Sequence, residues 1–254
     1  MIYSLTPVGD PPVLRPVLFS TITNVLAAIS TRNGGVSPAP LGMNTSFHVG
    51  DSEENVVRNR DLFCRSLGIT RHEIAVPGQV HSAVVCRVDR PREVPECDAL
   101  VTSTPRVFLS VSVADCVPIL LCDPNVRTVA AVHVGWRGTA AGILTRAIKR
   151  MCSDFAATPE GIIAYLGPAA SSCCYYVGDE VASRFDRRFV LRGEKGTVVD
   201  LKGANVQQLL DCGIRDSQIE ISPSCTISES GLFHSFRRDG VRSGRMMAVI
   251  GIIR

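Results

Sequence analysis

The clearest hydrophobic pattern lies in the middle of the chain, between Arg106 and Met151. Apolar residues alternate there with small or polar ones, which is typical of a strand with two different faces. One face carries Val107, Leu109, Val111 and Val113, and the other carries Phe108, Ser110, Ser112, Ala114 and Cys116. We therefore expect Cys116 to lie among small polar residues, where a cavity can form beside a sheet.

A second apolar run follows Cys116 and ends at Asp123-Pro124-Asn125, a sequence typical of a turn. Beyond the turn, Val129, Ala131 and His133 fall on one face of another strand. Cys116 and His133 stand at similar distances from the turn. If the two strands pair as a hairpin, both residues lie near the same end of neighbouring strands.

Helical spacing follows the glycine-containing segment Gly135-Trp136-Arg137-Gly138, because apolar residues recur every three or four positions through 140–151. A helix is also predicted over 51–67, which opens with oxygen-bearing and acidic residues and is followed by Gly68. Further helices are expected at 179–189 and 200–212. Further strands are expected within 17–30 and at 162–166, 197–199, 219–222, 233–236 and 245–253, after an extended lead-in at 1–16. No internal repeat interrupts this order, so residues 1–254 are predicted to form a single domain.

Composition narrows the class of protein. A chain of 254 residues with 45% hydrophobic residues can bury one large core. The net charge is +3 and the pI about 8.4, and Arg237 to Arg245 is the only dense basic stretch, so a dedicated nucleic-acid binder is not expected. No apolar run approaches the roughly 18 residues of a membrane span. Polar residues such as Thr21 interrupt the one stretch near the start that resembles a signal peptide. A cytoplasmic protein is therefore expected.

The ten cysteines are scattered along the chain, and no pair has the spacing of a zinc ribbon. A chain of this size does not need disulfides to fold. We expect most of the cysteines to be small buried hydrophobic residues in a reducing compartment.

Three residues are candidates for one metal site: His81, Cys116 and His133. Zinc accepts thiolate sulfur and imidazole nitrogen, and three protein ligands leave a fourth position for water or substrate. A second interpretation uses the same atoms, with Cys116 as a nucleophile and His133 as its base. Asp115 could orient the imidazole, although strand alternation places its side chain on the opposite face. The residue pattern alone leaves both interpretations open.

Two arginines are candidates for holding an anion. The turn from Gly135 to Gly138 presents backbone N–H groups ahead of a helix, and Arg137 adds charge beside it. Arg60 lies on the predicted helix over 51–67 and can point inward toward an anionic ligand.

In order and together, ten motifs resemble the multicopper polyphenol oxidoreductase (laccase-like) family, now regarded as purine nucleoside phosphorylases and also labelled peptidoglycan editing factors. They are Thr31-Arg32-Asn33-Gly34-Gly35-Val36-Ser37, Asn44 to Asp51, Asn59-Arg60, Gln79-Val80-His81, Ala114-Asp115-Cys116-Val117-Pro118, His133-Val134-Gly135-Trp136-Arg137-Gly138, Leu166-Gly167-Pro168, Asp200-Leu201, Cys225-Thr226 and Phe236-Arg237-Arg238. The resemblance implies an α+β fold, a four-layer α/β/β/α sandwich with mixed sheets. It also implies that His81, Cys116 and His133 are zinc ligands.

The activity that the resemblance implies is phosphorolysis of adenosine, inosine, guanosine and methylthioadenosine, together with adenosine deamination. The implied partners are a purine nucleoside and phosphate, with no nucleic acid or membrane, in a monomer or homodimer. Copper-dependent oxidation of phenols is an alternative, but multicopper oxidases need many histidines and the chain has five. Further alternatives are a Cys–His hydrolase and a cell-wall editing factor with a structural metal.

Within that scheme, arginine forks match phosphate oxygens. Arg60 and Arg137 are the first candidates for phosphate, with Arg237 or Arg238 behind them. Asn44 and Gln79 are candidates for hydrogen bonds to ribose or base. Asp115 is a candidate for orienting a ligand or shuttling a proton, with stabilisation of its turn as the alternative.

Overall fold

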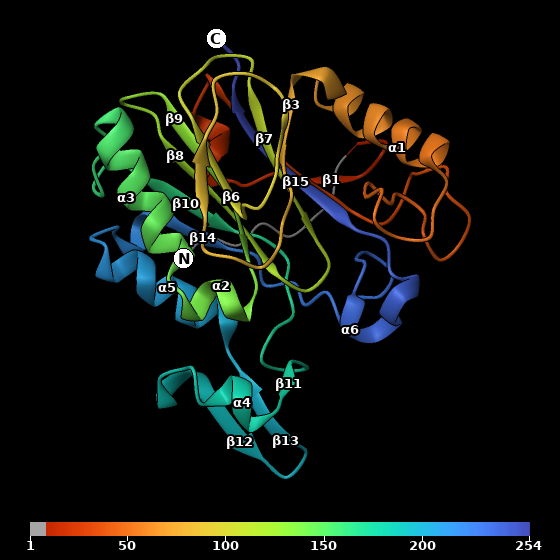
Figure 1. The fold of residues 1–254 in the computed structure, drawn as a ribbon, viewed down its shortest axis with the longest axis vertical. Coiled ribbons are helices and arrows are strands. Elements are labelled where there is room, and N and C mark those ends of the chain that lie inside the picture. Colours follow the sequence, from red (N-terminus) through yellow and green to blue (C-terminus); the bar gives the residue numbers. More distant parts are fainter. Residues whose placement is uncertain (1–8) are drawn as a thin grey trace.

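The computed structural model describes residues 9–254, so the predicted lead-in at 1–16 lies partly outside the described residues. Two six-stranded sheets face each other in the centre of the molecule (Figure 1). The first sheet has the order β1-β2-β15-β7-β3-β5, formed by Val13–Leu14, Val25–Ser30, Met246–Ile252, Phe108–Val113, Ile74–Pro77 and Glu93–Val94. Its first four strands are antiparallel, whereas β3 runs parallel to both β7 and β5.

The second sheet has the order β14-β10-β8-β9-β6-β4, formed by Ile219–Ile221, Ile163–Leu166, Val117–Asp123, Thr128–Val134, Ala99–Thr102 and Val85–Arg87. It is also mixed, because β14 and β4 run parallel to their neighbours while the central strands are antiparallel. The predicted hairpin is confirmed: β8 and β9 pair with Pro118 opposite His133. Cys116 directly precedes β8, so it lies at the same end as His133.

Helices cover the outer face of each sheet, which confirms the predicted mixed α+β fold (Figure 1). Helix α1 (Glu53–Ser66) covers the first sheet, and α3 (Ile143–Phe155) and α5 (Leu201–Asp211) cover the second. Three separate buried clusters lie between these four layers. The cluster between the sheets is the one that contains Leu109 and Leu120.

Helix boundaries follow the predicted caps. The Ser52 hydroxyl accepts the Asn55 N–H at the start of α1, and Asp200 accepts the Gly203 N–H at the start of α5. The remaining elements are a small sheet of β11 (Tyr176–Val177), β13 (Gly196–Val199) and β12 (Val190–Gly193), and the short helices α2 (Trp136–Ala140), α4 (Asp179–Ala182) and α6 (Phe236–Asp239). Five 3-10 turns lie at Leu18–Thr21, Arg71–Glu73, Arg187–Phe189, Asp216–Gln218 and Gly240–Arg242. In residues 9–254, no helix has both the length and the apolar character needed to cross a membrane.

Two predicted elements are interrupted by backbone with positive φ. Strand β7 ends at Val113, and the chain then turns through Asp115 (φ 89°) into the other sheet, so Cys116 does not lie on the face of β7 as predicted. The predicted helix over 140–151 is two helices, because Gly142 adopts the left-handed conformation (φ 69°) between α2 and α3. A left-handed residue cannot continue a right-handed helix.

Two other predictions of secondary structure are wrong. The expected helix at 179–189 is the four-residue α4 followed by a 3-10 turn at Arg187–Phe189, which the Asp186 side chain caps. The expected strand at 233–236 pairs with no strand of the described residues. There the Ser235 hydroxyl instead accepts the Arg238 N–H and starts α6.

Leu120→Ala tests whether the cluster between the sheets stabilises the fold. The Leu120 side chain is fully buried between the sheets, so its truncation should lower the free energy of unfolding by about 2–5 kcal/mol. Leu191→Ala, at a side chain that is 53% exposed, should change it by less than about 1 kcal/mol. Equal losses in urea-induced unfolding of the two variants would contradict the layer arrangement.

The buried His234 side chain is expected to lower the free energy of unfolding as the pH falls. Burial, followed by the nearby charges of Arg32 and Arg245, lowers its pKa from 6.5 to about 3. Arg238 acts in the same direction and Asp239 opposes it. Between these pH values the unfolded chain binds one more proton than the folded one, so stability falls as pH falls. From pH 7 to pH 5 this group should remove about 2 kcal/mol.

His234→Phe should flatten the dependence of unfolding free energy on pH between 7 and 5, because the titrating ring is gone. His72→Gln, at an exposed histidine, should leave that dependence as it is in the parent protein. Denaturant titrations at several pH values provide the measurement. An unchanged slope in His234→Phe would show that another group is responsible.

Candidate metal centre

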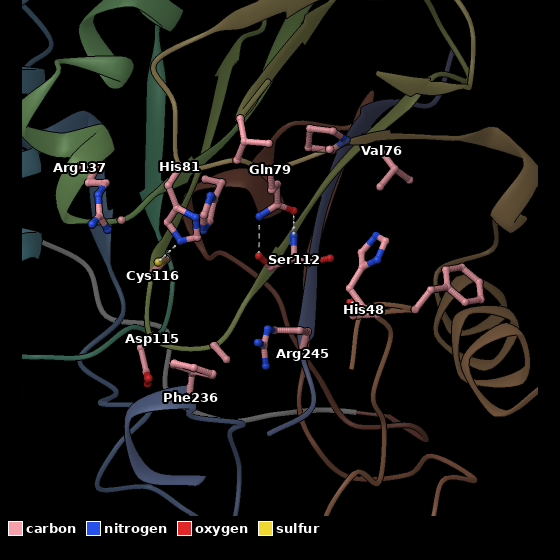
Figure 2. Close-up of a pocket in the computed structure, with 18 of the residues that line it drawn as sticks. His48, Val76, Gln79, His81, Ser112, Asp115, Cys116, Arg137, Phe236 and Arg245 are labelled. Atoms are coloured by element: carbon pink, nitrogen blue, oxygen red, sulfur yellow. Dashed lines mark hydrogen bonds between the residues drawn. The ribbon is translucent and has the colours of Figure 1, made fainter. Parts of the chain in front are cut away.

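The structure brings the three predicted metal ligands together (Figure 2). His81 lies in the loop after β3, Cys116 in the turn before β8, and His133 near the end of β9. Their donor atoms all lie within 4.8 Å of one another, and the Cys116 sulfur is 4.0 Å from Nε2 of His81. The two imidazole rings meet edge to face, with centroids 5.0 Å apart. Residues far apart in the sequence thus form one compact set of donors.

A buried carboxylate, Asp98, holds this set in place. Its oxygens accept hydrogen bonds from Nδ1 of His133 (2.8 Å) and from the backbone N–H groups of Val80 (3.2 Å), His81 (3.0 Å) and Ser82 (2.7 Å). The Ser82 hydroxyl adds a further bond of 2.8 Å. Burial opposes ionisation of Asp98, but the hydrogen bonds from His133 and Ser82 outweigh it and lower the pKa to about 2.

The ionised Asp98 determines the state of His133. Because a carboxylate only accepts hydrogen bonds, Nδ1 of His133 must carry the proton and Nε2 is left to face the centre. The same carboxylate stabilises a loop that contains two left-handed residues, Gln79 (φ 44°) and His81 (φ 59°). Such conformations persist when surrounding bonds hold them. The Gln79 side chain supplies two of these bonds, from its Nε2 to the Ser112 carbonyl (2.8 Å) and to its Oε1 from the Ser112 N–H (2.7 Å).

Electrostatics favour the thiolate of Cys116. Burial raises its pKa, but the charge of His133 and hydrogen bonds from both histidines prevail and lower it to about 6. Burial lowers the pKa of His133, but the charge of Cys116 and the hydrogen bond to Asp98 prevail and raise it to about 9. The thiolate is the form that binds metals and also the form that attacks as a nucleophile.

The close packing around the three donors and the chemistry of the donors themselves both fit a metal site. Gly135 packs so closely that a Cβ atom there would lie 2.9 Å from the Cys116 sulfur and 3.3 Å from Cδ2 of His81. Only glycine therefore fits beside the two ligands. One thiolate and two imidazoles suit zinc or copper better than magnesium or calcium, which prefer oxygen.

The three donors lie at one end of a cavity of about 1260 Å³. Four arginines line it: Arg60, Arg137, Arg237 and Arg245. Four aromatic side chains also line it: Phe47, Trp136, Tyr175 and Phe236. Four carboxylates, of Glu53, Glu93, Glu96 and Asp115, line it as well. The cavity thus combines a candidate metal centre with guanidinium groups that can bind an anion and flat apolar surfaces that suit an aromatic reactant.

Two of the predicted arginines line this cavity. The Arg60 guanidinium lies 4.4 Å from the centre of the Phe47 ring, and its Nε donates to the Thr45 carbonyl at 2.7 Å. Arg137 is exposed and lies 4.2 Å from the Trp136 ring. The helix that follows, α2, spans only Trp136–Ala140. The predicted anion-binding site at Gly135 to Gly138 therefore depends on the Arg137 side chain rather than on a helix N-terminus.

Asn44 and Arg238 have structural positions, and neither lines the cavity. Asn44 is fully buried; its amide donates to Asp51 and to the Ser46 carbonyl, and its oxygen accepts the Arg245 N–H. The Arg238 guanidinium donates to three backbone carbonyls and to Asp239. Gln79 lines the cavity, but its amide is already paired with the backbone of Ser112.

Asp115 stabilises a turn. Its oxygens accept the Thr226 hydroxyl (2.7 Å) and the Arg237 N–H (2.6 Å), and its side chain points away from His81 and Cys116 in Figure 2. The carboxylate that orients an imidazole is therefore Asp98, not Asp115. This role of Asp98 was not predicted from the sequence, although the residue stands directly before the buried strand β6.

Arg245 is a second residue that the sequence argument missed. It directly precedes β15 and extends into the cavity below Gln79 and Ser112 (Figure 2). One of its terminal nitrogens donates to the carbonyls of Ser243 (2.8 Å) and Gly244 (3.0 Å). The possible signal was its place in the basic stretch from Arg237 to Arg245.

Comparison with known proteins gives close relatives over most of the chain. Residues 26–253 match the family model described as multi-copper polyphenol oxidoreductase laccase. A purine nucleoside phosphorylase from Deinococcus radiodurans is 38% identical, with 94% of each chain covered. The purine nucleoside phosphorylase YlmD from Bacillus subtilis is 34% identical, covering 90% of this chain and 88% of that one. The crystal structure of YlmD from Geobacillus stearothermophilus has a TM-score of 0.92 at 32% identity, covering 99% of this chain and 100% of that one.

Asp98→Asn tests the role of the buried carboxylate. An amide cannot accept all five hydrogen bonds, so His133 and the His81 loop should lose their fixed orientation. Zinc affinity, measured by competition with a chromophoric chelator, should fall about 10–100-fold. Asp123→Asn is a matched control, because Asp123 is also buried and accepts backbone N–H groups, but at the far end of β8. Equal zinc affinities in the two variants would contradict the role of Asp98.

Proposed function

The chain belongs to the multi-copper polyphenol oxidoreductase laccase family, as its motifs predicted, and we propose that it is a zinc-dependent purine nucleoside phosphorylase. The reaction joins a phosphate oxygen to the anomeric carbon of a purine nucleoside as the glycosidic C–N bond breaks. The electron pair of that bond leaves with the base, which takes up a proton. The products are the free purine and ribose 1-phosphate. The arrangement of His81, Cys116 and His133 beside a cavity with four arginines is the main support.

Zinc is the proposed metal because its usual donors are thiolate sulfur and imidazole nitrogen. With three protein donors, a bound zinc ion would have one position left for water or substrate. When bound, zinc supplies Lewis-acid chemistry, which polarises an oxygen placed against it and makes water more acidic. His81, Cys116 and His133 hold the ion in this proposal, and Asp98 keeps the Nδ1 proton on His133 so that Nε2 remains a donor.

Phosphate is placed at the end of the cavity near the metal centre. Arg245 is close enough to Cys116 and Asp115 to feel their charges, and Arg137 follows the close-packed Gly135. In residues 9–254, no carboxylate forms an ion pair with either guanidinium within 4.0 Å, so both are available to an anion. Arginine forks bind phosphate oxygens in pairs. Arg237 is assigned a smaller role in binding phosphate, because its guanidinium already donates to the Tyr176 carbonyl.

The nucleoside occupies the rest of the cavity in this proposal. Phe47 and Phe236 are both partly exposed, and each offers a flat apolar surface for a purine. Arg60 lies over Phe47, and the charge of Glu93 acts on it. We place phosphate beside Arg137 and Arg245 near the metal centre and the neutral nucleoside beyond it, against the aromatic rings.

Adenosine deamination is proposed as a second activity of the same site. In this reaction the oxygen of water bonds to the carbon that carries the amino group, and ammonia leaves as the C–N bond breaks. The step requires a water molecule beside the base and residues that increase its acidity. The partly open positions of His81 and Cys116 allow water to reach the donors from the cavity. Adenosine, inosine, guanosine and methylthioadenosine are the proposed substrates of phosphorolysis. We place the activity in the cytoplasm, with the protein as a monomer or homodimer.

The family description favours copper-dependent oxidation of phenols as the alternative. That chemistry usually needs several copper ions held by many histidines. The chain has five histidines, and in residues 9–254 only two of them, His81 and His133, belong to a set of donors that could hold a metal. A cell-wall editing role, with the metal as a structural ion, fits poorly with donors that face a large cavity.

Cys116→Ala should abolish phosphate-dependent release of base. Loss of the thiolate removes a metal ligand, and Lewis-acid catalysis is worth several kcal/mol, so the rate should fall by at least about 1000-fold. Products of adenosine and inosine, formed with and without phosphate by protein of known zinc content, can be resolved chromatographically. Cys152→Ala removes a partly buried thiol on α3 and should keep the parent rate. Turnover only of phenols with copper would support the alternative function.

Arg137→Met should raise the KM for phosphate about 10–100-fold, because a hydrogen bond to a charged group is worth about 1.5–3 kcal/mol. Arg146→Met removes an exposed arginine from α3, outside the cavity, and should leave that KM unchanged. Initial rates at varied phosphate and saturating inosine give both values. A similar KM in the two variants would remove Arg137 from the proposed phosphate site.

A further inference from the structure

A second set of metal-binding side chains lies outside the site described above. Cys173 and Cys174 follow β10 in one loop, and Cys225 follows β14 in another. Their three sulfur atoms lie within 4.8 Å of one another, and those of Cys173 and Cys174 are 3.1 Å apart. A parallel bridge between Ala169 and Cys225 joins the two loops, and the Thr226 N–H donates to the Ala169 carbonyl at 3.1 Å.

These cysteines do not behave as the small buried hydrophobic residues expected from the sequence. All ten cysteines are free, and only four of them are buried, so the expectation is wrong for most. Within the group, Cys225 is buried, Cys174 is partly exposed and Cys173 is exposed. An ion can therefore reach the three sulfur atoms from the side of Cys173.

The surroundings of Cys225 stabilise a thiolate. Burial raises the pKa of the Cys225 thiol, but hydrogen bonding by Ser171, Ser228 and Ile227 prevails and lowers it to about 7. The buried ammonium of Lys202 is close enough to feel the charge of Cys225. It is fixed by bonds of 2.7 Å to the carbonyls at positions 222 and 224. Hydrogen-bond donors beside a fixed cation make a favourable site for negative sulfur.

We propose that Cys173, Cys174 and Cys225 bind one Cu(I) ion through three sulfur atoms. No imidazole or carboxylate belongs to this set of donors in residues 9–254, and thiolates select soft cations. All three donors are sulfur, whereas the first set includes two imidazoles, so this set is the softer of the two and favours Cu(I). On binding, the cysteines that are still thiols release their protons to the solvent as the Cu–S bonds form. The proposal is independent of the reaction assigned to His81, Cys116 and His133.

The test is a titration of the reduced full-length protein with Cu(I), without oxygen and in competition with bathocuproine disulfonate. The starting protein is Cys116→Ala, so that the thiolate of the first site does not contribute. One equivalent of Cu(I) should bind tightly. X-ray absorption at the copper edge should show a shell of three sulfur atoms and no nitrogen.

Further substitutions in this background identify the ligands. Cys225→Ser should weaken Cu(I) binding by more than about 100-fold, since changes even outside the ligand shell cost about 10–100-fold. The double variant Cys173→Ser/Cys174→Ser, which leaves the buried Cys225 in place, should have the same effect without loss of fold by circular dichroism. Cys152→Ser/Cys212→Ser, a matched pair of partly buried cysteines elsewhere, should retain the affinity.

Four results would overturn the proposal. The first is the absence of tight Cu(I) binding in Cys116→Ala. The second is a copper shell that contains nitrogen ligands. The third is a folded Cys173→Ser/Cys174→Ser variant with undiminished affinity. The fourth is preferential retention of one Zn(II) over Cu(I) by the three cysteines, because the assignment requires a set that selects the softer cation.

Discussion

The hydrogen bonds to Asp98 are the interaction on which the candidate metal centre depends. One buried carboxylate accepts hydrogen bonds from Nδ1 of His133 and from three consecutive backbone N–H groups of the loop that carries His81. Asp98 therefore fixes His133 through its imidazole ring and His81 through its backbone. An uncompensated buried carboxylate would be costly, so the five donors and the charge on Asp98 require each other. The same hydrogen bonds therefore order the loop and hold two of the three metal-binding side chains in place.

The packing of two sheets determines where this centre can form. The chain leaves the first sheet after Val113 and enters the second at Val117, and the turn between them carries Cys116. The hairpin of β8 and β9 then brings His133 to the same end of the second sheet. Gly135 allows the backbone to pack closely against the Cys116 sulfur and the His81 ring. The edge between the sheets is left open as the cavity, so the donors face space that a reactant can occupy.

The sequence predicted features that depend on local pattern or on family motifs. The hairpin, the caps at Ser52 and Asp200, and the mixed α+β fold follow from alternation, capping residues and motif order. Prediction from the sequence failed where long-range contacts determine the role of a side chain. Asp98 has no local signature, because its partners lie in the loop that carries His81 and in strand β9. Asn44 and Arg238 are polar residues in matching motifs, but the structure shows that their groups hold the backbone.

A crystal structure of the zinc-loaded protein, with anomalous data on both sides of the zinc edge, tests the central claim most directly. The account predicts one strong peak about 2.3 Å from the Cys116 sulfur and about 2.0–2.1 Å from Nε2 of His81 and of His133, with the fourth position toward the cavity. A peak elsewhere, or an ion enclosed by four protein ligands, would contradict a catalytic metal centre at these residues.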